Sequence, residues 1–376
     1  MIGFLRRLMA MIGKEARQLR RDRLTFMMMF GMPIMQLVLF GYAINNDPKG
    51  LPTAIIAYEH SSLSRALVSA FGNTGYFAFT RDVATEAEAD NLLQRGDVQF
   101  VITVPPDFTR RLVRREKPQI AIEADATDPA TIGGALSAVN QALSQTLSRE
   151  LAGPLASLRA GPQPVDVILH RRYNPEGITR YNVVPGLLGV ILTMTMVMMT
   201  ALAVTREYER GTMENLLAMP VRPIEVMIGK IVPYILIGAM QVVVILIAAR
   251  VLFGVPFEGS PLLFIAGTLL FITVSLAVGF TFSTVAQNQL QAVQMSFFFL
   301  MPSILLSGFA FPFRGMPGWA QVLGECLPVT HFLRVVRGVM LKGASFEQVA
   351  PEIATLALML VVIGSVAMAR YKVTLD

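Results

Sequence analysis

The chain has 376 residues, of which 53% are hydrophobic and only 15% are charged. Soluble proteins carry about 25% charged residues, and apolar runs of about 18 residues or more recur here, so the composition excludes an ordinary soluble protein and predicts a polytopic α-helical membrane protein. The net charge of +6 does not indicate nucleic-acid binding, because the basic residues cluster at the edges of the apolar runs, where membrane topology places them.

Residues 1–23 are predicted to form a cytoplasmic amphipathic helix that lies at the membrane interface. Leu5, Leu8 and Ile12 recur at helical spacing, and seven basic residues occupy the rest of this stretch. A simple basic flank of the following span is the alternative interpretation, and the two are compatible. Residues 24–44 form the first predicted transmembrane helix, which is too long for the core of a cleaved signal peptide. The basic residues before it predict a cytoplasmic N-terminus.

Residues 45–180 differ in character, because charged residues return and short β-rich runs alternate with helical patterns. The predicted strands cover residues 53–58, 76–80, 98–104, 119–124 and 165–171, and the predicted helices cover residues 62–71, 85–94, 107–115 and 131–158. This alternation predicts an inserted α/β domain, which the orientation of the first span places outside the cytoplasm. The only cysteine is Cys326, so no internal disulfide is available and packing alone must stabilise the domain, which fits a bacterial periplasm.

Five further transmembrane helices are predicted between residues 181 and 370, which gives six in all. They cover about residues 183–204, 228–249, 262–285, 292–311 and 353–369. Six spans put both termini on the same side of the membrane, so residues 371–376 are predicted to form a cytoplasmic tail.

The segment 312–350 conflicts with the usual distribution of basic residues, because six spans place it on the outer side. It carries Arg334, Arg337 and Lys342, whereas basic residues normally accumulate on the cytoplasmic side. One explanation is that this segment forms interfacial or re-entrant helices.

Polar residues inside the predicted spans are candidates for a translocation path. They are Thr193, Thr195, Thr200, Gln241, Ser296 and Ser303. Hydrogen bonding between packed helices is the alternative, and we favour it by roughly two to one, because such groups commonly hold membrane helices together.

The sequence contains no energy source of its own. Gly229-Lys230 is not a phosphate-binding loop, because Ile224 and Ile231 stand where that motif requires glycine and a hydroxyl. No ionisable residue lies well inside a predicted span, which argues against an ion-coupled transporter. The three histidines are far apart and show no metal-ligand spacing. We therefore expect no ATPase activity, cofactor or metal in this chain.

A charged connection at residues 205–227, which we call the elbow, separates the second and third predicted spans. Its sequence from Arg206 is R-E-Y-E-R-G-T-M-E-N-L-L. Arg206, Glu209 and Arg210 can share one helix face. Gly211-Thr212 then provides a break and an N-cap for a second short helix. A plain polar loop is the alternative interpretation, with about even odds on these residues alone.

The run from Arg206 to Lys230 resembles the signature of ABC-2-type permeases, the membrane subunits of ABC exporters. Three further stretches carry the same resemblance: the basic N-terminal helix with the first span, residues 104–108 (V-P-P-D-F), and residues 305–332 from L-L-S-G to P-V-T-H-F. The resemblance is closest to bacterial multidrug or small-molecule permeases with a large extracytoplasmic domain between the first two spans. It implies six spans in the bacterial inner membrane.

In that family the elbow is the coupling helix, which docks into the ATP-hydrolysing subunit. The resemblance therefore implies a transmission surface made of Arg206, Glu207, Glu209, Arg210, Gly211, Thr212 and Glu214. It also implies ATP and Mg²⁺ on a partner ABC ATPase subunit, a second permease half that is either identical or a paralogue, and a periplasmic adaptor protein.

The leading hypothesis is therefore the permease subunit of an ATP-driven exporter of apolar or amphipathic small molecules. The alternative is a non-transporting membrane scaffold or sensor whose extracytoplasmic domain binds a ligand or an adaptor. A membrane enzyme is disfavoured, because no nucleophile–base set or carboxylate pair stands out.

Overall fold

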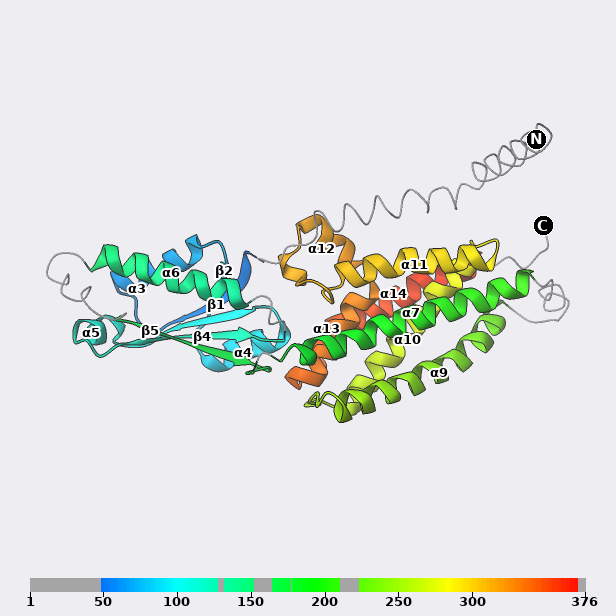
Figure 1. The fold of residues 1–376 in the computed structure, drawn as a ribbon, viewed down its shortest axis with the longest axis horizontal. Coiled ribbons are helices and arrows are strands. Elements are labelled where there is room, and N and C mark those ends of the chain that lie inside the picture. Colours follow the sequence, from blue (N-terminus) through cyan, green and yellow to red (C-terminus); the bar gives the residue numbers. More distant parts are fainter. Residues whose placement is uncertain (1–48, 128–131, 152–163, 177, 210–222, 371–376) are drawn as a thin grey trace, which may run out of the picture.

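The computed structural model describes residues 49–127, 132–151, 164–176, 178–209 and 223–370. The predicted interfacial helix 1–23, the predicted first span 24–44 and the predicted tail 371–376 lie outside these residues. Figure 1 shows two parts side by side: a unit built on a β-sheet, and a bundle of long helices.

The sheet-bearing part, which we call the α/β unit, runs from residue 51 to residue 172. Its strands are β1 (Leu51–Ala57), β2 (Phe77–Asp82), β3 (Phe100–Val104), β4 (Gln119–Asp125) and β5 (Asp166–Arg172), and its helices are α3 (Ser62–Asn73), α4 (Glu86–Arg95), α5 (Phe108–Val113) and α6 (Ile132–Glu150). The strand order is β2-β1-β3-β4-β5. Only the β3–β4 pair is antiparallel, and the other pairs are parallel. Each strand and helix that the sequence predicts here is present, with ends that differ by a few residues, except that the predicted end of the long helix at residue 158 lies outside the described residues.

Helices cover both faces of the sheet. Successive strand residues point to opposite faces, and apolar residues occur on both. On one face, Phe100 and Ile102 pack in a core with residues of α3, α5 and α6. On the other face, Val101 packs with Leu93 of α4. Figure 1 shows α3 and α6 on one side of the sheet and α4 on the other. The unit therefore has three layers.

The helical part contains seven α-helices among the described residues. They are α7 (Thr179–Glu209), α9 (Pro223–Val251), α10 (Pro261–Ser283), α11 (Gln289–Leu306), α12 (Gly318–Glu325), α13 (Pro328–Lys342) and α14 (Phe346–Arg370), with a 3₁₀ turn η4 at Phe313–Gly315. Five of them, α7, α9, α10, α11 and α14, are long and apolar enough to cross a membrane. They correspond to the second to sixth predicted spans, while the first predicted span lies outside the described residues.

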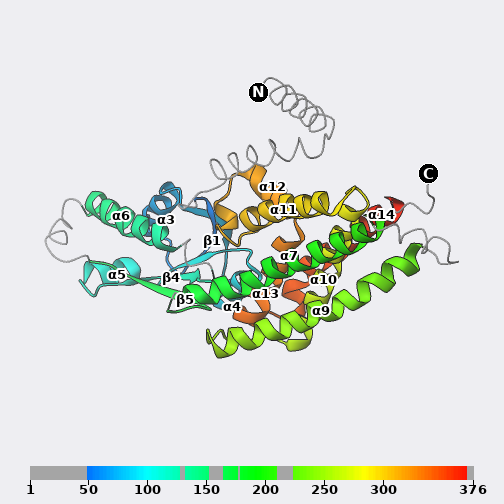
Figure 2. The same cartoon turned by 45° about the vertical axis from the view of Figure 1, so that its right-hand side comes forward.

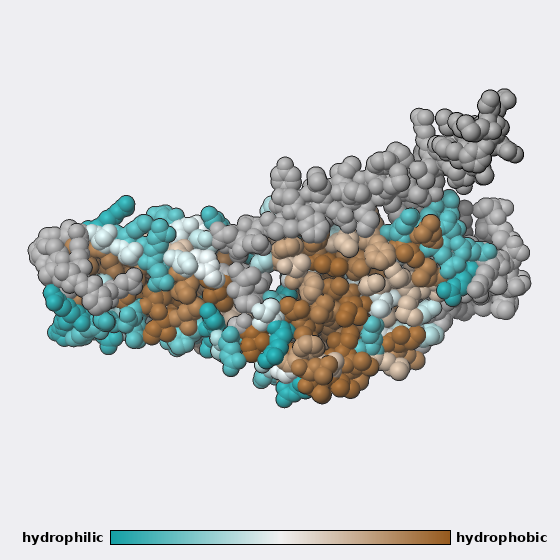
Figure 3. Space-filling model, viewed as in Figure 1, coloured by the Kyte–Doolittle hydropathy of each residue, from teal (hydrophilic) through white to brown (hydrophobic). Residues whose placement is uncertain are grey.

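The face of the helical bundle seen in Figure 3 is mostly apolar between its polar ends. Met240 and Val244 of α9 are 70% and 65% exposed, and Val361 of α14 is 65% exposed. Figures 1 and 2 place α9 along the outer edge of the bundle beside α7. Side chains of this kind, exposed over the length of a span, are suited to lipid or to another apolar helix.

Helix α13 is enclosed by the bundle although it is too short to cross a membrane. It has 15 residues, and all of them except Arg334, Arg337 and Lys342 are buried. It packs on α7, α10 and α14, and its Phe332 ring stacks on Phe271 of α10 with centroids 4.0 Å apart. The three basic residues that conflict with simple topology are therefore the half-buried residues of α13, and all three line a cavity between the bundle and the α/β unit. Its position in the membrane remains a prediction.

Candidate functional site

The described parts of the elbow are residues 205–209 at the end of α7 and residues 223–227 at the start of α9. This end of α7 and the start of α9 lie at the far end of the bundle from the α/β unit (Figure 1). Arg206 and Glu209 are exposed there. Arg210, Gly211, Thr212, Glu214 and the side chain of Glu207 lie outside the described residues, so the proposed transmission surface stays a prediction for them.

Glu209 bonds to the connection between α10 and α11. Its Oε1 accepts a hydrogen bond from the backbone N–H of Gln289 at 2.7 Å, and its Oε2 accepts one from the Gln289 side-chain amide. These bonds hold the pKa of the Glu209 carboxyl below its usual value. Asn288 caps α11 by accepting from the backbone N–H of Gln291 at 2.8 Å. Glu209 therefore joins the elbow to a second, hydrogen-bonded turn at the same end of the bundle.

The hydroxyl groups predicted as candidates for a translocation path bond mainly within their own helices. Thr193, Thr200, Ser296 and Ser303 are buried, and each donates to the carbonyl four residues earlier at 2.7 to 2.9 Å. Thr195 does the same at 2.7 Å and also donates to Oε1 of Gln241 on α9 at 2.9 Å. Only the bond from Thr195 to Gln241 joins two helices, as the alternative of hydrogen bonding between packed helices expects. The translocation path stays a prediction for all six residues.

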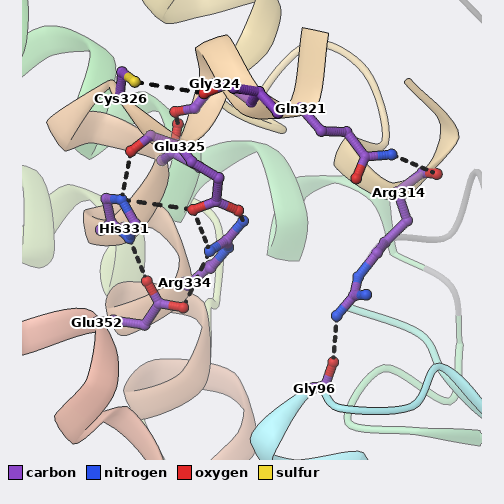
Figure 4. A network of polar contacts seen from close by, with 11 residues as sticks. Gly96, Arg314, Gln321, Gly324, Glu325, Cys326, His331, Arg334 and Glu352 are labelled. Atoms are coloured by element: carbon purple, nitrogen blue, oxygen red, sulfur yellow. Dashed lines mark hydrogen bonds and ion pairs between the residues drawn. The ribbon is translucent and has the colours of Figure 1, made fainter. Parts of the chain in front are cut away.

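A second polar group lies at the other end of the bundle, where α12, α13 and α14 meet. Figure 4 shows His331 and Arg334 of α13 between Glu325 of α12 and Glu352 of α14. Arg334 Nη2 lies 2.5 Å from Glu325 Oε1, and Arg334 Nη1 lies 3.1 Å from Glu352 Oε1. His331 Nδ1 lies 2.5 Å from Glu352 Oε2, and its Nε2 lies 2.9 Å from the Glu325 carbonyl oxygen. We call these four residues the α13 cluster.

The α13 cluster favours a charged histidine. Both ring nitrogens of His331 face acceptor oxygens, so both must donate, which only the imidazolium does. Burial by itself would lower the pKa of His331, but the bonds to Glu352 and to the Glu325 carbonyl outweigh it and raise this pKa above the usual value. Two carboxylates therefore face two cations, and the cluster is close to neutral overall.

Sequence reasoning missed the α13 cluster. The predicted sixth span begins at about residue 353, whereas α14 begins at Phe346, so Glu352 lies inside the helix, in its second turn. The spacing of His331 and Arg334 places both on one helix face, and this was the available signal. Their carboxylate partners are on other helices, and no local pattern connects them.

A polar cavity of about 470 Å³ adjoins the α13 cluster, between the bundle and the α/β unit. Arg334, Glu352 and Arg337 line it from the bundle, and Asp97 and Asp125 line it from the α/β unit. Among the described residues, no group of three or more His, Cys, Asp or Glu side chains is arranged to hold a metal ion.

A helical bundle with membrane-length apolar helices and an α/β unit at one end defines a polytopic membrane protein. The chain belongs to the ABC-2 transporter family, because the family model described as "ABC-2 family transporter protein" matches residues 23–369. This confirms the resemblance that the elbow and the other three stretches indicate. The chain is thus a membrane permease of the ABC type.

Relatives of known name support this assignment over nearly the whole chain. The chain is 28% identical over 344 residues to the probable multidrug ABC transporter permease YbhS of Escherichia coli, with 90% of this chain and 89% of that protein covered. It is 30% identical over 335 residues to the inner membrane transport permease YhhJ of Escherichia coli, with 86% of each covered. It is also 23% identical over 343 residues to ABC transporter G family member 20 of Dictyostelium discoideum, covering 88% of this chain and 45% of that protein.

Proposed function

We propose that this chain is the membrane subunit of an ATP-driven exporter in a bacterial inner membrane, with both termini in the cytoplasm and the α/β unit outside. The observation that carries this proposal is the match to the ABC-2 family over residues 23–369. The 376 residues contain no phosphate-binding loop. Energy must therefore come from a partner, which we take to be an ABC ATPase subunit that binds ATP and Mg²⁺.

The elbow is the proposed docking point for the ATPase. It follows α7, a continuous helix from Thr179 to Glu209 that packs on α10, α11 and α13. A displacement of the elbow would therefore be passed along α7 to the opposite end of the bundle. The bonds from Gln289 to Glu209 would make the α10–α11 connection move with it.

The proposed cargo is an apolar or amphipathic small molecule taken from the cytoplasm or the inner membrane. The hydroxyls of Thr193, Thr200 and Ser296 are bonded within their own helices, and the charged side chains of the α13 cluster lie at one end of the bundle. The relative YbhS carries the name of a probable multidrug permease. A path without fixed charges suits apolar or amphipathic molecules better than small inorganic ions.

We further propose a second permease half, identical or paralogous, and a periplasmic adaptor protein as partners. The exposed apolar residues of α9 and α14, among them Met240 and Val361, supply surface for lipid or for that second half. No feature of the chain suggests nucleic acid as a partner.

Purification of the tagged protein from its native cells tests this proposal. We expect a stoichiometric ATPase to co-purify, and the complex in proteoliposomes to expel ethidium, an amphipathic cation, when ATP is supplied. Glu209→Lys should lower the amount of ethidium expelled per ATP, because lysine cannot accept the hydrogen bonds of Gln289. Glu176→Lys is the matched control, since Glu176 is exposed and lies away from the elbow.

Two results would count against the exporter. The first is the absence of an ATPase in several detergents and in nanodiscs. The second is a complex that hydrolyses ATP without moving ethidium or other amphipathic dyes. Normal coupling in well-folded Glu209→Lys protein would refute the role given to Glu209. The exporter proposal would then rest on the co-purified ATPase and on ethidium transport.

One observation favours the alternative of a scaffold or sensor. A cavity of about 720 Å³ opens on the α/β unit at the carboxyl ends of β1 and β2, lined in part by Glu59, Arg65, Phe79 and Asp82. Ligands of open α/β sheets usually bind at the carboxyl ends of parallel strands. A sensor predicts ligand binding by the full chain that does not depend on ATP, and transport that never appears.

A further inference from the structure

Among the described residues, four polar contacts join the α/β unit to the helical bundle, and we call them the docking contacts. One is the bond from Lys342 Nζ to the Leu93 carbonyl at 3.3 Å. Lys342 Nζ lies 2.5 Å from Asp125 Oδ2. The side-chain amide of Gln348 donates to Oε1 of Gln94 at 2.6 Å. Arg314 Nη2 donates to the Gly96 carbonyl at 3.0 Å.

The contact between Lys342 and Asp125 is a buried ion pair. The two side chains are only 8% and 9% exposed. The other carboxylate oxygen of Asp125 accepts from the backbone N–H and the hydroxyl of Thr127 at 3.1 and 2.7 Å. The Lys342 ammonium also donates to the Leu93 carbonyl at 3.3 Å and lies over the Tyr173 ring at 5.4 Å. A buried pair with its other bonds satisfied tolerates only a narrow range of geometries.

The bundle presents positive charge to the negative end of a helix. Leu93 and Gly96 are at the carboxyl end of α4, which carries partial negative charge from the helix dipole. Lys342 and Arg314 approach the carbonyls of these two residues from the bundle. The docking contacts therefore depend on the orientation of the α/β unit, because only this end of α4 is complementary to the two cations.

Lys342 is also connected, through α13, to α7, the helix that ends in the elbow. It is the last residue of α13, and α13 packs closely against α7. A Cβ atom added to Gly189 of α7 would lie 3.2 to 3.3 Å from side-chain atoms of Leu333, Phe332 and Val329 of α13. A change in the placement of the α/β unit would therefore displace α13, and α13 would in turn displace α7, because the two helices are tightly packed.

We propose that Lys342 and Asp125 are positioning residues, which fix the α/β unit over the end of the bundle, with the polar cavity of about 470 Å³ between the two parts. Transport depends on this fixed placement. The dependence of transport rests on the function proposed above, whereas the placement itself does not.

The test uses a variant that removes the pair and leaves no unpaired buried charge. Lys342→Met keeps the apolar stem, and Asp125→Asn keeps an acceptor for Thr127, so the double variant is expected to fold. Arg314→Gln is a milder second variant, because Arg314 is exposed and its loss does not threaten folding. Arg110→Glu is the control, since it disrupts the exposed Arg110–Asp107 pair of the same unit.

Spin-label distances in the full chain report the placement directly. One label goes on the native Cys326, which is exposed and is the only cysteine. The other goes on Asn73→Cys at the exposed end of α3. We expect a narrow distance distribution in the wild type and in Arg110→Glu, a broad one in the double variant, and a slightly broadened one in Arg314→Gln.

Transport should be lost when the α/β unit loses its fixed placement, and it should return when a cross-link restores that placement. In a Cys326→Ser background, Gln94→Cys and Gln348→Cys allow a bis-maleimide to replace a docking contact. We expect the double variant to lose most ATP-dependent ethidium efflux and the cross-link to restore it, although the ion pair is still absent. A purely structural pair predicts normal efflux in every double-variant molecule that folds.

Two results would overturn the proposal. A narrow distance distribution in the double variant would show that Lys342 and Asp125 do not fix the placement. A broad distribution with full efflux would show that transport does not depend on it. A wild-type complex without efflux would refute the exporter and leave the distance measurement as a valid test of the pair.

Discussion

Buried polar side chains of the helical bundle occur in two regions that bond in different ways. In the α13 cluster, His331 and Arg334 bond to carboxylates on two other helices. In the middle of the spans, Thr193, Thr200 and Ser296 donate to carbonyls of their own helix. Bonds between elements fix how the elements are arranged, whereas bonds within a helix satisfy a polar atom without choosing a neighbour.

This difference predicts that the two regions respond differently to substitution. Removal of one charge from the α13 cluster leaves another charge buried without its partner. Removal of a hydroxyl from a span leaves a carbonyl that still has its backbone hydrogen bond. The following predictions test this contrast in order of decreasing effect.

Glu352→Ala should be the most destabilising of these changes, because it takes a carboxylate from both His331 and Arg334. A broken, fully buried ion pair costs about 3–5 kcal/mol. We expect about 2 kcal/mol here, because the Arg334 side chain is 35% exposed and is partly screened by solvent. Thermal denaturation in detergent micelles, followed by size-exclusion chromatography, measures the loss.

Glu347→Ala is the matched control, on the same helix but at an exposed position. It removes a carboxylate from the first turn of α14, which should cost less than about 1 kcal/mol. Equal losses for Glu347→Ala and Glu352→Ala would refute a special role for the α13 cluster.

The spans α7 and α10 are also held together by close packing of their backbones at Gly279 of α10. A Cβ added to Gly279 of α10 would lie 2.4 Å from the Val197 carbonyl oxygen of α7. Overpacking costs about 1–3 kcal/mol, and alanine recovers about 1 kcal/mol of helix propensity. Gly279→Ala should therefore destabilise the protein by up to about 2 kcal/mol in the same thermal assay, because the obstructing atom is a backbone oxygen that cannot rotate aside.

Gly364→Ala in α14 is the control for Gly279→Ala, because a Cβ at Gly364 meets no atom within 4 Å. The identical substitution should there be neutral or slightly stabilising in the thermal assay. A loss of stability at Gly364 as large as that at Gly279 would show that the crossing of α7 and α10 is not tight.

The α13 cluster should also make stability depend on pH. The pKa of His331 is raised in the folded state by Glu352 and the Glu325 carbonyl, against the effect of burial and of nearby Arg334. Its contribution is therefore complete below the unfolded pKa of about 6.5 and is lost as the pH rises through the raised folded value. The melting temperature should fall over this range, and His331→Gln should flatten the curve, while the exposed His170→Gln should not.

The elements of the α/β unit could be predicted because their signals are local. Ser61 and Thr85 cap α3 and α4 by accepting from Ser64 N–H and Glu88 N–H, and both caps precede helical patterns in the sequence. Pro105-Pro106 ends β3. The end of the long helix predicted to residue 158 is different, because α6 ends at Glu150 and residues 152–163 lie outside the described part of the chain.

The contacts that assemble these elements could not be predicted in the same way. Lys342 and Asp125 are 217 positions apart, and Glu209 and Gln289 are 80 apart. Each residue alone has an ordinary explanation as a topology signal or a surface charge. Only the packing of α13 and the end of α7 brings the partners together, so the basic residues of segment 312–350 looked like an inconsistency in topology.

Two threonines on α7 provide the finest test of the contrast. Thr193 and Thr195 both donate to the carbonyl four residues earlier, at 2.7 Å, but only Thr195 also donates to Gln241 of α9. Thr193→Val should leave stability almost unchanged, because Gly189 keeps its backbone donor. Thr195→Val should cost about 0.6 kcal/mol, the average for a hydrogen bond between membrane helices.

The same two variants decide between the alternatives for the hydroxyls of the spans. If these groups only pack helices, Thr193→Val supports ethidium efflux at the wild-type rate. If they line the path, Thr193→Val changes the rate although the protein is as stable as before, and Thr195→Val changes it by more than its small loss of stability explains. The ratio of efflux to folded protein in each variant therefore distinguishes a translocation path from helix packing, since only a path makes that ratio depend on a hydroxyl bonded within its own helix.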